Sequence, residues 1–228
     1  MKRLIVNADD FGLCPGIDEG IVELAARGIV TSVSVLADLV RPAAIAELLS
    51  RASAVGIGLH VDFTHDLVHY DPNDLSGRLE RQLERFATLV GRAPDHLDSH
   101  KHAHCDHRAA CAAMLAVGVP LRATKCRARR LVRSRGLACP DHFAGSAGVR
   151  PALSRVGLEA LLRNLDSGTT ELMCHPAVRW DGPRRLRYGP QRVSEFRAFL
   201  AVPFRARAAA HGVELVSFSS LVPCLSSS

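Results

Sequence analysis

The sequence predicts an α/β fold in which a mainly parallel sheet of about seven strands is covered by helices. Short apolar runs alternate along the chain with stretches of helical periodicity, which is typical of such a sheet. The 228 residues contain no internal repeat or long linker apart from the short tail 226–228, so we expect a single domain spanning residues 1–228. The sheet could close into a barrel or stay open and doubly wound. In both cases functional groups should collect where the strands end.

The first half of the chain supplies three strands and three helices. Residues 4–6 are aliphatic and are followed by a short polar segment, which predicts the first strand. Residues 17–28 carry apolar side chains at helical spacing and end in a glycine, which predicts a helix. Residues 31–36 are rich in β-branched side chains and predict the second strand. The next predicted elements are a helix over 42–51, a strand over 55–63 and a helix over 79–90.

The second half continues the same alternation of strands and helices. Strand-like segments fall at 95–104, 119–123, 171–175 and 213–218. Helices are predicted at 107–117, 158–166 and 193–210. Strand-like segments separated by helices in this way favour parallel pairing, because a parallel connection needs a crossover long enough to hold a helix.

The composition is that of a globular protein, with 47% hydrophobic and 23% charged residues. This content excludes disorder for most of the chain, and no apolar run approaches the ~18–20 residues of a membrane span. The start MKRLIVNADDFG has too short an apolar region for a signal peptide, so we expect a cytoplasmic protein. A formal charge of +6 does not by itself predict a nucleic-acid partner.

The cysteines indicate free thiols. Their number is odd, they form no CxxC pair, and both facts speak against a disulfide framework or a zinc ribbon. Cys174 precedes His175, but neighbours in a strand face opposite sides, so the two cannot form a Cys–His dyad. The seven cysteines stand at positions 14, 105, 111, 126, 139, 174 and 224.

Four polar clusters lie at the ends of apolar strand runs. Five of the eleven histidines fall between His96 and His107. If this segment were a strand, Asp98, His100, His102 and His104 would point to the same face. Burying such groups side by side is costly unless a cation or a polar site uses them. The four polar clusters are residues 7–10, 58–60, 96–104 and 171–176.

Imidazole and carboxylate groups together suit zinc and other first-row divalent ions. A hydrolytic metal site also needs a base beside the ligands, and the adjacent Asp9 and Asp10 could supply one ligand and one base. Alternatives remain for each group. The aspartates could cap a helix, His60 could be a hydrogen-bonded core histidine, and the histidine run could bind metal adventitiously.

Four sequence segments together resemble the YdjC-like family of carbohydrate deacetylases. One such motif would be weak, but four in this order are specific. The resemblance implies a TIM-like, seven-stranded β/α barrel related to polysaccharide deacetylases. It also implies a divalent metal ion, Mg²⁺ or Zn²⁺, and removal of N-acetyl groups from amino sugars. The four segments are NADDFG (7–12), GLHVDFT (58–64), HLDSHKHAH (96–104) and ELMCHPA (171–177).

The resemblance also implies roles for individual residues. Asp10, His60 and His100 match the family's metal ligands, and Asp9 matches its catalytic base. His175 occupies a histidine position of the last motif, where we expect a general acid or a group beside the oxyanion.

Four other residues are candidates for substrate binding. His102 and His104 match motif positions and could lie beside the ligands or touch the acetyl or sugar group. Trp180, the only tryptophan, could stack on a sugar ring or simply pack within a loop. Arg122 ends a strand-like run and could contact substrate or pair with Asp9 and keep it ionised. The alternative for Arg122 is an ordinary surface arginine.

The segment 122–135 carries seven basic residues and no acidic one. Such a run is usually a solvated face, but it could also cover the site and favour a substrate with phosphate or carboxylate groups. Aromatic residues do not interleave with these charges, so binding of single-stranded nucleic acid is not expected.

Three functions remain in competition. The leading one is a metal-dependent deacetylase of N-acetylated amino sugars, and the second is a metal-dependent phosphoesterase or other amidohydrolase with the same ligands. The third is a basic anion-binding module in which the histidines only store metal. The predicted partner is the amino-sugar substrate, with a homodimer as a further option and neither nucleic acid nor a membrane span.

Overall fold

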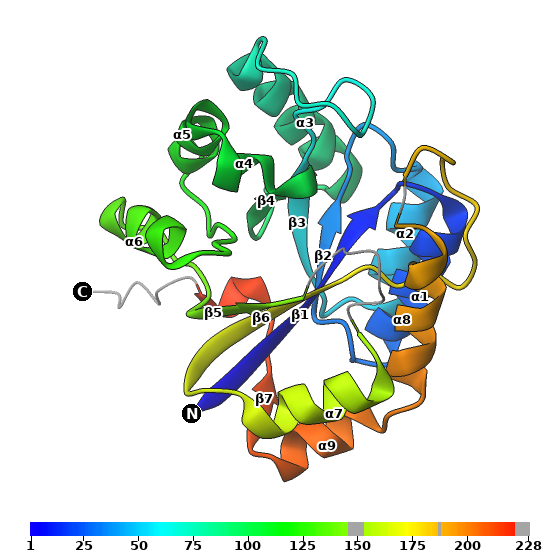
Figure 1. Ribbon diagram of the computed structural model, residues 1–228. Helices are drawn as coiled ribbons and strands as arrows, with labels where there is room; N and C mark the ends of the chain where they lie inside the picture. Colours follow the sequence, from blue (N-terminus) through cyan, green and yellow to red (C-terminus); the bar gives the residue numbers. More distant parts are fainter. Residues whose placement is uncertain (146–152, 187, 222–228) are drawn as a thin grey trace.

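The computed structural model describes residues 1–145, 153–186 and 188–221. Its strands form one parallel sheet in the order β4-β3-β2-β1-β6-β5, and β7 pairs with the amino-terminal part of β1. The sheet is curled into a half-barrel (Figure 1). This confirms the predicted seven-stranded parallel α/β fold. The strands are β1 Lys2–Phe11, β2 Ser32–Val35, β3 Gly56–Val61, β4 Leu97–Ser99, β5 His142–Ala144, β6 Gly168–Cys174 and β7 Val213–Leu215.

Helices surround the sheet on its outer side (Figure 1). Pro15, Pro42 and Pro190 each stand in the first turn of a helix, where a proline costs no intrahelical hydrogen bond. The helices are α1 Pro15–Ala26, α2 Pro42–Arg51, α3 Leu75–Val90, α4 Ala103–Asp106, α5 Arg108–Ala116, α6 Cys126–Ser134, α7 Arg155–Asn164, α8 Pro190–Leu200 and α9 Phe204–Ala210, with 3₁₀ turns at His100–His102 and Phe218–Leu221.

β1 is the central strand and is buried on both faces from Leu4 to Phe11. It pairs with β2 on one side and with β6 on the other, in continuous register from Lys2↔Gly168 to Ala8↔Cys174. A parallel strand covered by helices loses contact with water on both faces, which explains its continuous aliphatic run. The carboxyl ends of β1, β3, β4 and β6 therefore meet at one edge of the sheet.

Two of the predicted strands are wrong in extent or type. The strand predicted over 95–104 ends at Ser99, because Lys101 and His102 have left-handed backbone conformations with φ of 54° and 55°. His100, His102 and His104 therefore do not alternate along one strand. Residues 119–123 make only an isolated parallel bridge, between Leu121 and Leu97.

Three further elements differ from the sequence prediction. The basic segment 122–135 is mostly the helix α6, and the short strand β5 was not predicted. The single helix predicted over 193–210 is divided into α8 and α9. Pro203 stands between the two helices, where it lacks the N–H that a continuous helix would require.

The sequence predicted neither disulfide bonds nor a membrane span. The six cysteines in these residues are free thiols, and Cys224 lies outside them. None of the helices in the described ranges combines the length and hydrophobicity that a membrane crossing requires.

Candidate active site

A cavity of about 860 Å³ opens at the carboxyl ends of β1, β3, β4 and β6. Four of the predicted site residues line its floor together with His175, which follows β6. The rest of its wall comes from β5, β6, α8 and the loops, and it includes Phe143 of β5, Met173 of β6 and Tyr188 just before α8. The floor residues from the earlier strands are Asp9, Asp10, His60 and His100.

Asp9 and Asp10 both face the site because the end of β1 is irregular. The register between β1 and β2 shifts between Ala8 and Phe11, and Asp10 has a left-handed φ of 67°. Adjacent residues in a regular strand would point to opposite faces of the sheet. The bulge re-aims the Asp10 carboxylate, and a strained residue held in this way is common at functional sites.

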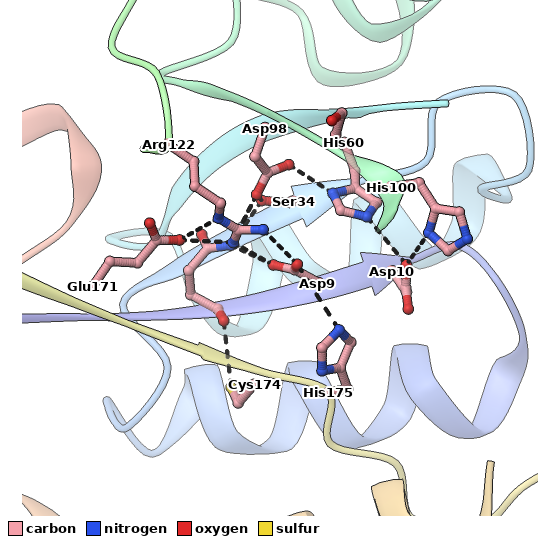
Figure 2. Close-up of polar contacts among 12 residues, drawn as sticks. Asp9, Asp10, Ser34, His60, Asp98, His100, Arg122, Glu171, Cys174 and His175 are labelled. Carbon is pink, nitrogen blue, oxygen red and sulfur yellow. Dashed lines mark hydrogen bonds and ion pairs between the residues drawn. The ribbon is translucent and has the colours of Figure 1, made fainter. Parts of the chain in front are cut away.

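Three potential metal ligands converge at this point (Figure 2). Oδ1 of Asp10 lies 3.2 Å from Nε2 of His60 and 3.0 Å from Nδ1 of His100. The opposite nitrogen of each ring is also engaged: Nδ1 of His60 lies 2.6 Å from Oδ1 of Asp98, and Nε2 of His100 lies 3.1 Å from the Leu67 carbonyl oxygen. Each ring thus directs one nitrogen to an outer acceptor and the other toward Asp10.

The donor set fits a divalent cation. Three acceptor atoms facing one another across such short distances need a proton or a cation between them. Burial lowers the pKa of His60, but the neighbouring Asp98 and Asp10 raise it more. The resulting pKa is well above its usual value. A proton and a metal ion therefore compete for the same place between His60 and Asp10.

A fully buried arginine, Arg122, holds the carboxylate of Asp9 in place. Nη1 and Nη2 of Arg122 donate to the two carboxylate oxygens of Asp9, each at 2.7 Å. The guanidinium also lies 2.8 Å from Oδ2 of Asp98 and 2.7 Å from Oε1 of Glu171 (Figure 2). Burial raises the pKa of Asp9, but Arg122 outweighs it and lowers the pKa below the ordinary value, so Asp9 is a carboxylate at neutral pH.

His175 lies on the other side of Asp9, with Nε2 3.9 Å from Oδ2 of that carboxylate. Its backbone N–H donates to Oε2 of Glu195 at 2.6 Å, and its ring contacts Tyr188 edge-on. The buried Nδ1 atom has no hydrogen-bond partner among the described residues. Burial, followed by the charge of Arg192, lowers the pKa of His175 to about 4, so the resting imidazole is neutral at pH 7.

The remaining predicted residues divide between the cavity and its surroundings. His102 lines the cavity, and burial lowers its pKa to about 3. His104 is buried outside the cavity lining and bonds to Ser99 Oγ and to the Arg122 carbonyl oxygen at 2.6 and 3.0 Å. It supports the backbone of Arg122, which makes substrate contact by His104 the less suitable interpretation.

Arg122 and Trp180 also require revision as substrate-binding residues. Arg122 is 0% exposed, so the surface-arginine alternative is wrong and the guanidinium has no free surface to offer a substrate. Its pairing with Asp9 is the predicted contact that the structure shows. Trp180 lies over Gly182, Gly189 and the guanidinium of Arg192, and it packs within its loop outside the cavity lining.

The contribution of α8 to the site was not predicted from the sequence. Nη2 of Arg192 donates to Oδ2 of Asp10 at 2.6 Å, and Glu195 accepts hydrogen bonds from the His175 backbone and the Tyr188 hydroxyl. The sequence contains a sign of this contribution, because Arg192 and Glu195 share the helical spacing of the buried Phe199 and Val202. Charged residues on the apolar face of a helix indicate a buried polar site.

Comparison with known proteins agrees with this fold and motif order. The sequence pattern of the family described as YdjC-like protein matches residues 3–210. A chitooligosaccharide deacetylase of Serratia marcescens is 30% identical, with 96% of this chain and 99% of the relative aligned. A carbohydrate deacetylase of Homo sapiens is 31% identical, with 97% of this chain and 94% of the relative aligned.

Two solved structures show the same fold at low sequence identity. A proposed cellobiose-phosphate cleavage protein of Enterococcus faecalis V583 has a TM-score of 0.82 at 23% identity, over 96% of this chain and 98% of the other. A family 4 carbohydrate esterase of Streptomyces lividans has a TM-score of 0.53 at 11% identity, over 95% of this chain and 91% of the other. The family match covers most of the sequence and includes all four motifs. The chain therefore belongs to the YdjC-like protein family.

Proposed function

We propose that this chain is a metal-dependent hydrolase that removes N-acetyl groups from amino sugars and releases acetate. One observation carries the proposal: donor atoms of Asp10, His60 and His100, from three separate parts of the chain, lie within 4.8 Å of one another, and the Asp9 carboxylate lies within the same distance of His60. Relatives that align over almost the entire chain are named as deacetylases of carbohydrates or chitooligosaccharides, which supports an amide of an amino sugar as substrate.

Asp10, His60 and His100 would hold the divalent ion, Mg²⁺ or Zn²⁺, and the two imidazoles favour zinc. A cation bound there supplies Lewis acidity toward an amide carbonyl and lowers the pKa of a water molecule. Asp98 fixes the tautomer of His60 through its 2.6 Å contact, and the Leu67 carbonyl does the same for His100. Arg192 orients the free oxygen of Asp10.

Asp9 is the proposed base. Its carboxylate is ionised and is held in one orientation by the two parallel hydrogen bonds from Arg122. It would accept the proton of the attacking water as the C–O bond to the acetyl carbon forms. The same pairing that keeps Asp9 ionised also positions it, so the base needs no reorganisation before it acts.

His175 is the proposed route of the proton to the leaving amine. The departing nitrogen needs a proton because an amide anion is a very poor leaving group. The resting ring is neutral, so it would take up the proton that Asp9 has accepted and then donate it to nitrogen. The two groups are 3.9 Å apart, so this transfer requires a bridging water or a closer approach in the substrate complex. Because the pKa of His175 is lowered to about 4, its protonated form is a stronger acid than an ordinary imidazolium. The proton taken from water is thereby returned to the amine.

The cavity suits a sugar with an apolar substituent. Its volume of about 860 Å³ is within the usual range for ligand pockets. Phe143, Met173 and Tyr188 provide apolar surface, while the buried Nη1 of Arg192 has no acceptor among the described residues. We also propose that residues 1–228 form a single catalytic domain, because one sheet contains both β1 and β7.

A phosphoesterase is the second candidate function. Lys101, Lys125 and Arg185 line the cavity, and cations at this place favour an anionic substrate. The name of the related Enterococcus structure refers to a sugar phosphate. The same residues would then act on a phosphate ester in place of an amide.

Acetate release distinguishes the two functions. The metal-loaded protein is incubated with N-acetylglucosamine, its β-1,4-linked oligosaccharides and an N-acetylated glycolipid, and in parallel with phosphate esters of the same sugars. We expect acetate from at least one amide substrate, loss of this activity after chelation, and recovery on adding zinc. Phosphate release that exceeds acetate release on matched substrates would favour the phosphoesterase.

A further inference from the structure

A second group of potential metal ligands lies on the loop between β3 and α3, outside the catalytic floor. This loop is closed by a bridge between Thr64 and Tyr70 and by a hydrogen bond from the His65 N–H to the His69 carbonyl oxygen at 3.2 Å. The closure places the two histidines side by side. Their rings stack with centroids 5.5 Å apart and planes 19° from parallel.

Asp66 completes the group. Its Oδ2 atom lies 2.8 Å from Nδ1 of His69 and 3.9 Å from Nε2 of His65, and the three ligand atoms are all within 4.8 Å of one another. Its other oxygen, Oδ1, accepts the backbone N–H groups of Val68 and His69 at 2.9 and 2.8 Å. The loop backbone therefore fixes the carboxylate and leaves Oδ2 available between the two rings.

We propose that His65, Asp66 and His69 form a second cation site that takes zinc or a similar first-row divalent ion. Two imidazoles and one carboxylate are a common donor set for zinc, and Zn–N and Zn–O bonds of about 2.0–2.2 Å place neighbouring ligand atoms at separations of this size. The side chains are 58%, 32% and 68% exposed, so water could complete the coordination. This site does not depend on the proposed function.

The surroundings favour a cation at this position. A separate cavity of about 190 Å³ is lined by His65 and Asp66 together with Asp38 and Asp62, and Arg185 is the cation in its lining. Hydrogen bonds from the loop backbone, led by that of His69, lower the pKa of Asp66 well below its ordinary value. The carboxylate is therefore charged throughout the pH range in which histidine binds metal.

The loop also touches the catalytic floor. The Leu67 carbonyl oxygen accepts the Nε2–H of His100 at 3.1 Å, and the Val68 carbonyl oxygen accepts Lys101 Nζ at the same distance. Leu67 itself has a left-handed φ of 65°, which is unfavourable for a residue with a side chain. A cation bound by Asp66 and His69, which flank Leu67 on both sides, would stiffen the segment that orients His100.

Counting bound zinc tests the proposal. The chain is stripped of metal with a chelator and dialysed against zinc chloride, and zinc per chain is measured by atomic absorption. We expect two ions for the parent chain and one for the His65→Gln/His69→Gln double variant. His211→Gln, which changes a histidine at the end of α9, is the matched control and should still bind two. Equal zinc content in the double variant and the parent chain would overturn the proposal.

The Asp10→Asn variant separates this site from the catalytic one. We expect it to bind one zinc ion, and we expect none when it is combined with the loop substitutions. If Asp10→Asn retains the parent content while the loop variant loses one ion, the loop site stands and the metal of the proposed function fails. If Asp10→Asn loses the only bound ion and the loop substitutions change nothing, the loop site fails and the metal of the proposed function stands.

Discussion

Arg122 joins carboxylates from three different strands of the sheet. Asp9 belongs to β1, Asp98 to β4 and Glu171 to β6, and each lies within 2.8 Å of the guanidinium. A charge buried in this way is stabilised only while its partners remain, because water cannot replace them. Since Arg122 also orients Asp9, this one residue affects both folding and the proposed base.

We predict that Arg122→Met lowers the free energy of unfolding by about 3–5 kcal/mol, because it leaves buried carboxylates without a counter-charge. Urea unfolding followed by circular dichroism measures this change. Arg133→Met is the control, since Arg133 pairs with Asp141 at 2.6 Å on the surface and such pairs contribute about 1 kcal/mol or less. Equal effects of the two substitutions would contradict the prediction.

Glu171 should make stability depend on pH. Burial raises its pKa from 4.5 to about 7, although Arg122 acts in the opposite direction, and its buried Oε2 has no partner among the described residues. The folded state therefore holds this proton more tightly than the unfolded state. Its contribution to stability is present below about pH 4.5 and is lost as the pH rises through about 7.

Glu171→Gln removes this titration. We predict that the stability of the variant relative to the parent chain increases between about pH 5 and about pH 8, as measured by urea unfolding at several pH values. Glu47→Gln, at an exposed position on α2, is the control. A difference between Glu171→Gln and the parent chain that stays constant across this range would show that the folded-state pKa is not raised.

At the scale of elements, the site depends on where strands stop being regular. The bulge at the end of β1 turns Asp9 and Asp10 into the same cavity, and the left-handed turn after β4 sends His100 and His104 to different places. The alternating pattern of the histidine segment predicted a continuous strand. It failed because backbone conformation at Lys101 and His102, which hydrophobic patterning does not encode, ended the strand at Ser99.

β3 needs a glycine two residues before the proposed ligand His60. A Cβ atom at Gly58 would lie 2.3–2.5 Å from three atoms of the His96 ring, which is buried and stacked on Phe218. We predict that Gly58→Ala lowers the free energy of unfolding by about 1–3 kcal/mol, because the ring and the strand must move apart. Gly157→Ala, on α7, is the control and should be neutral or stabilising. Denaturant unfolding of both variants decides this, and a neutral Gly58→Ala would refute the close contact.

At the scale of the molecule, the sequence was sufficient for the fold class and for the convergence of the strand-end clusters. The carboxyl ends of parallel strands meet at one edge, so Asp10 and His60 could be expected together. Arg192 could not be placed in the same way, since it is 182 residues from Asp10 and reaches it only through the packing of α8. The burial of Arg122 likewise depends on partners from three strands.

Metal binding should stabilise the entire fold, because the three proposed ligands come together only in the folded chain. A ligand present at 100 times its dissociation constant stabilises by about 2.7 kcal/mol. We predict that zinc raises the unfolding temperature of the chelator-treated protein by roughly 5–10 °C, as measured by scanning calorimetry. Asp10→Asn should lose most of this increase, and an equal increase in this variant would place the stabilising ion elsewhere.

The most direct test of the central claim measures zinc content and acetate release on the same preparation of Asp9→Asn. Asn keeps the size of the side chain but cannot accept the proton of an attacking water. We predict that the variant binds as much zinc as the parent chain and releases acetate about 10²–10⁴-fold more slowly. Zinc content equal to that of the parent chain together with an unchanged rate of acetate release would contradict the assignment of Asp9 as the base beside the metal.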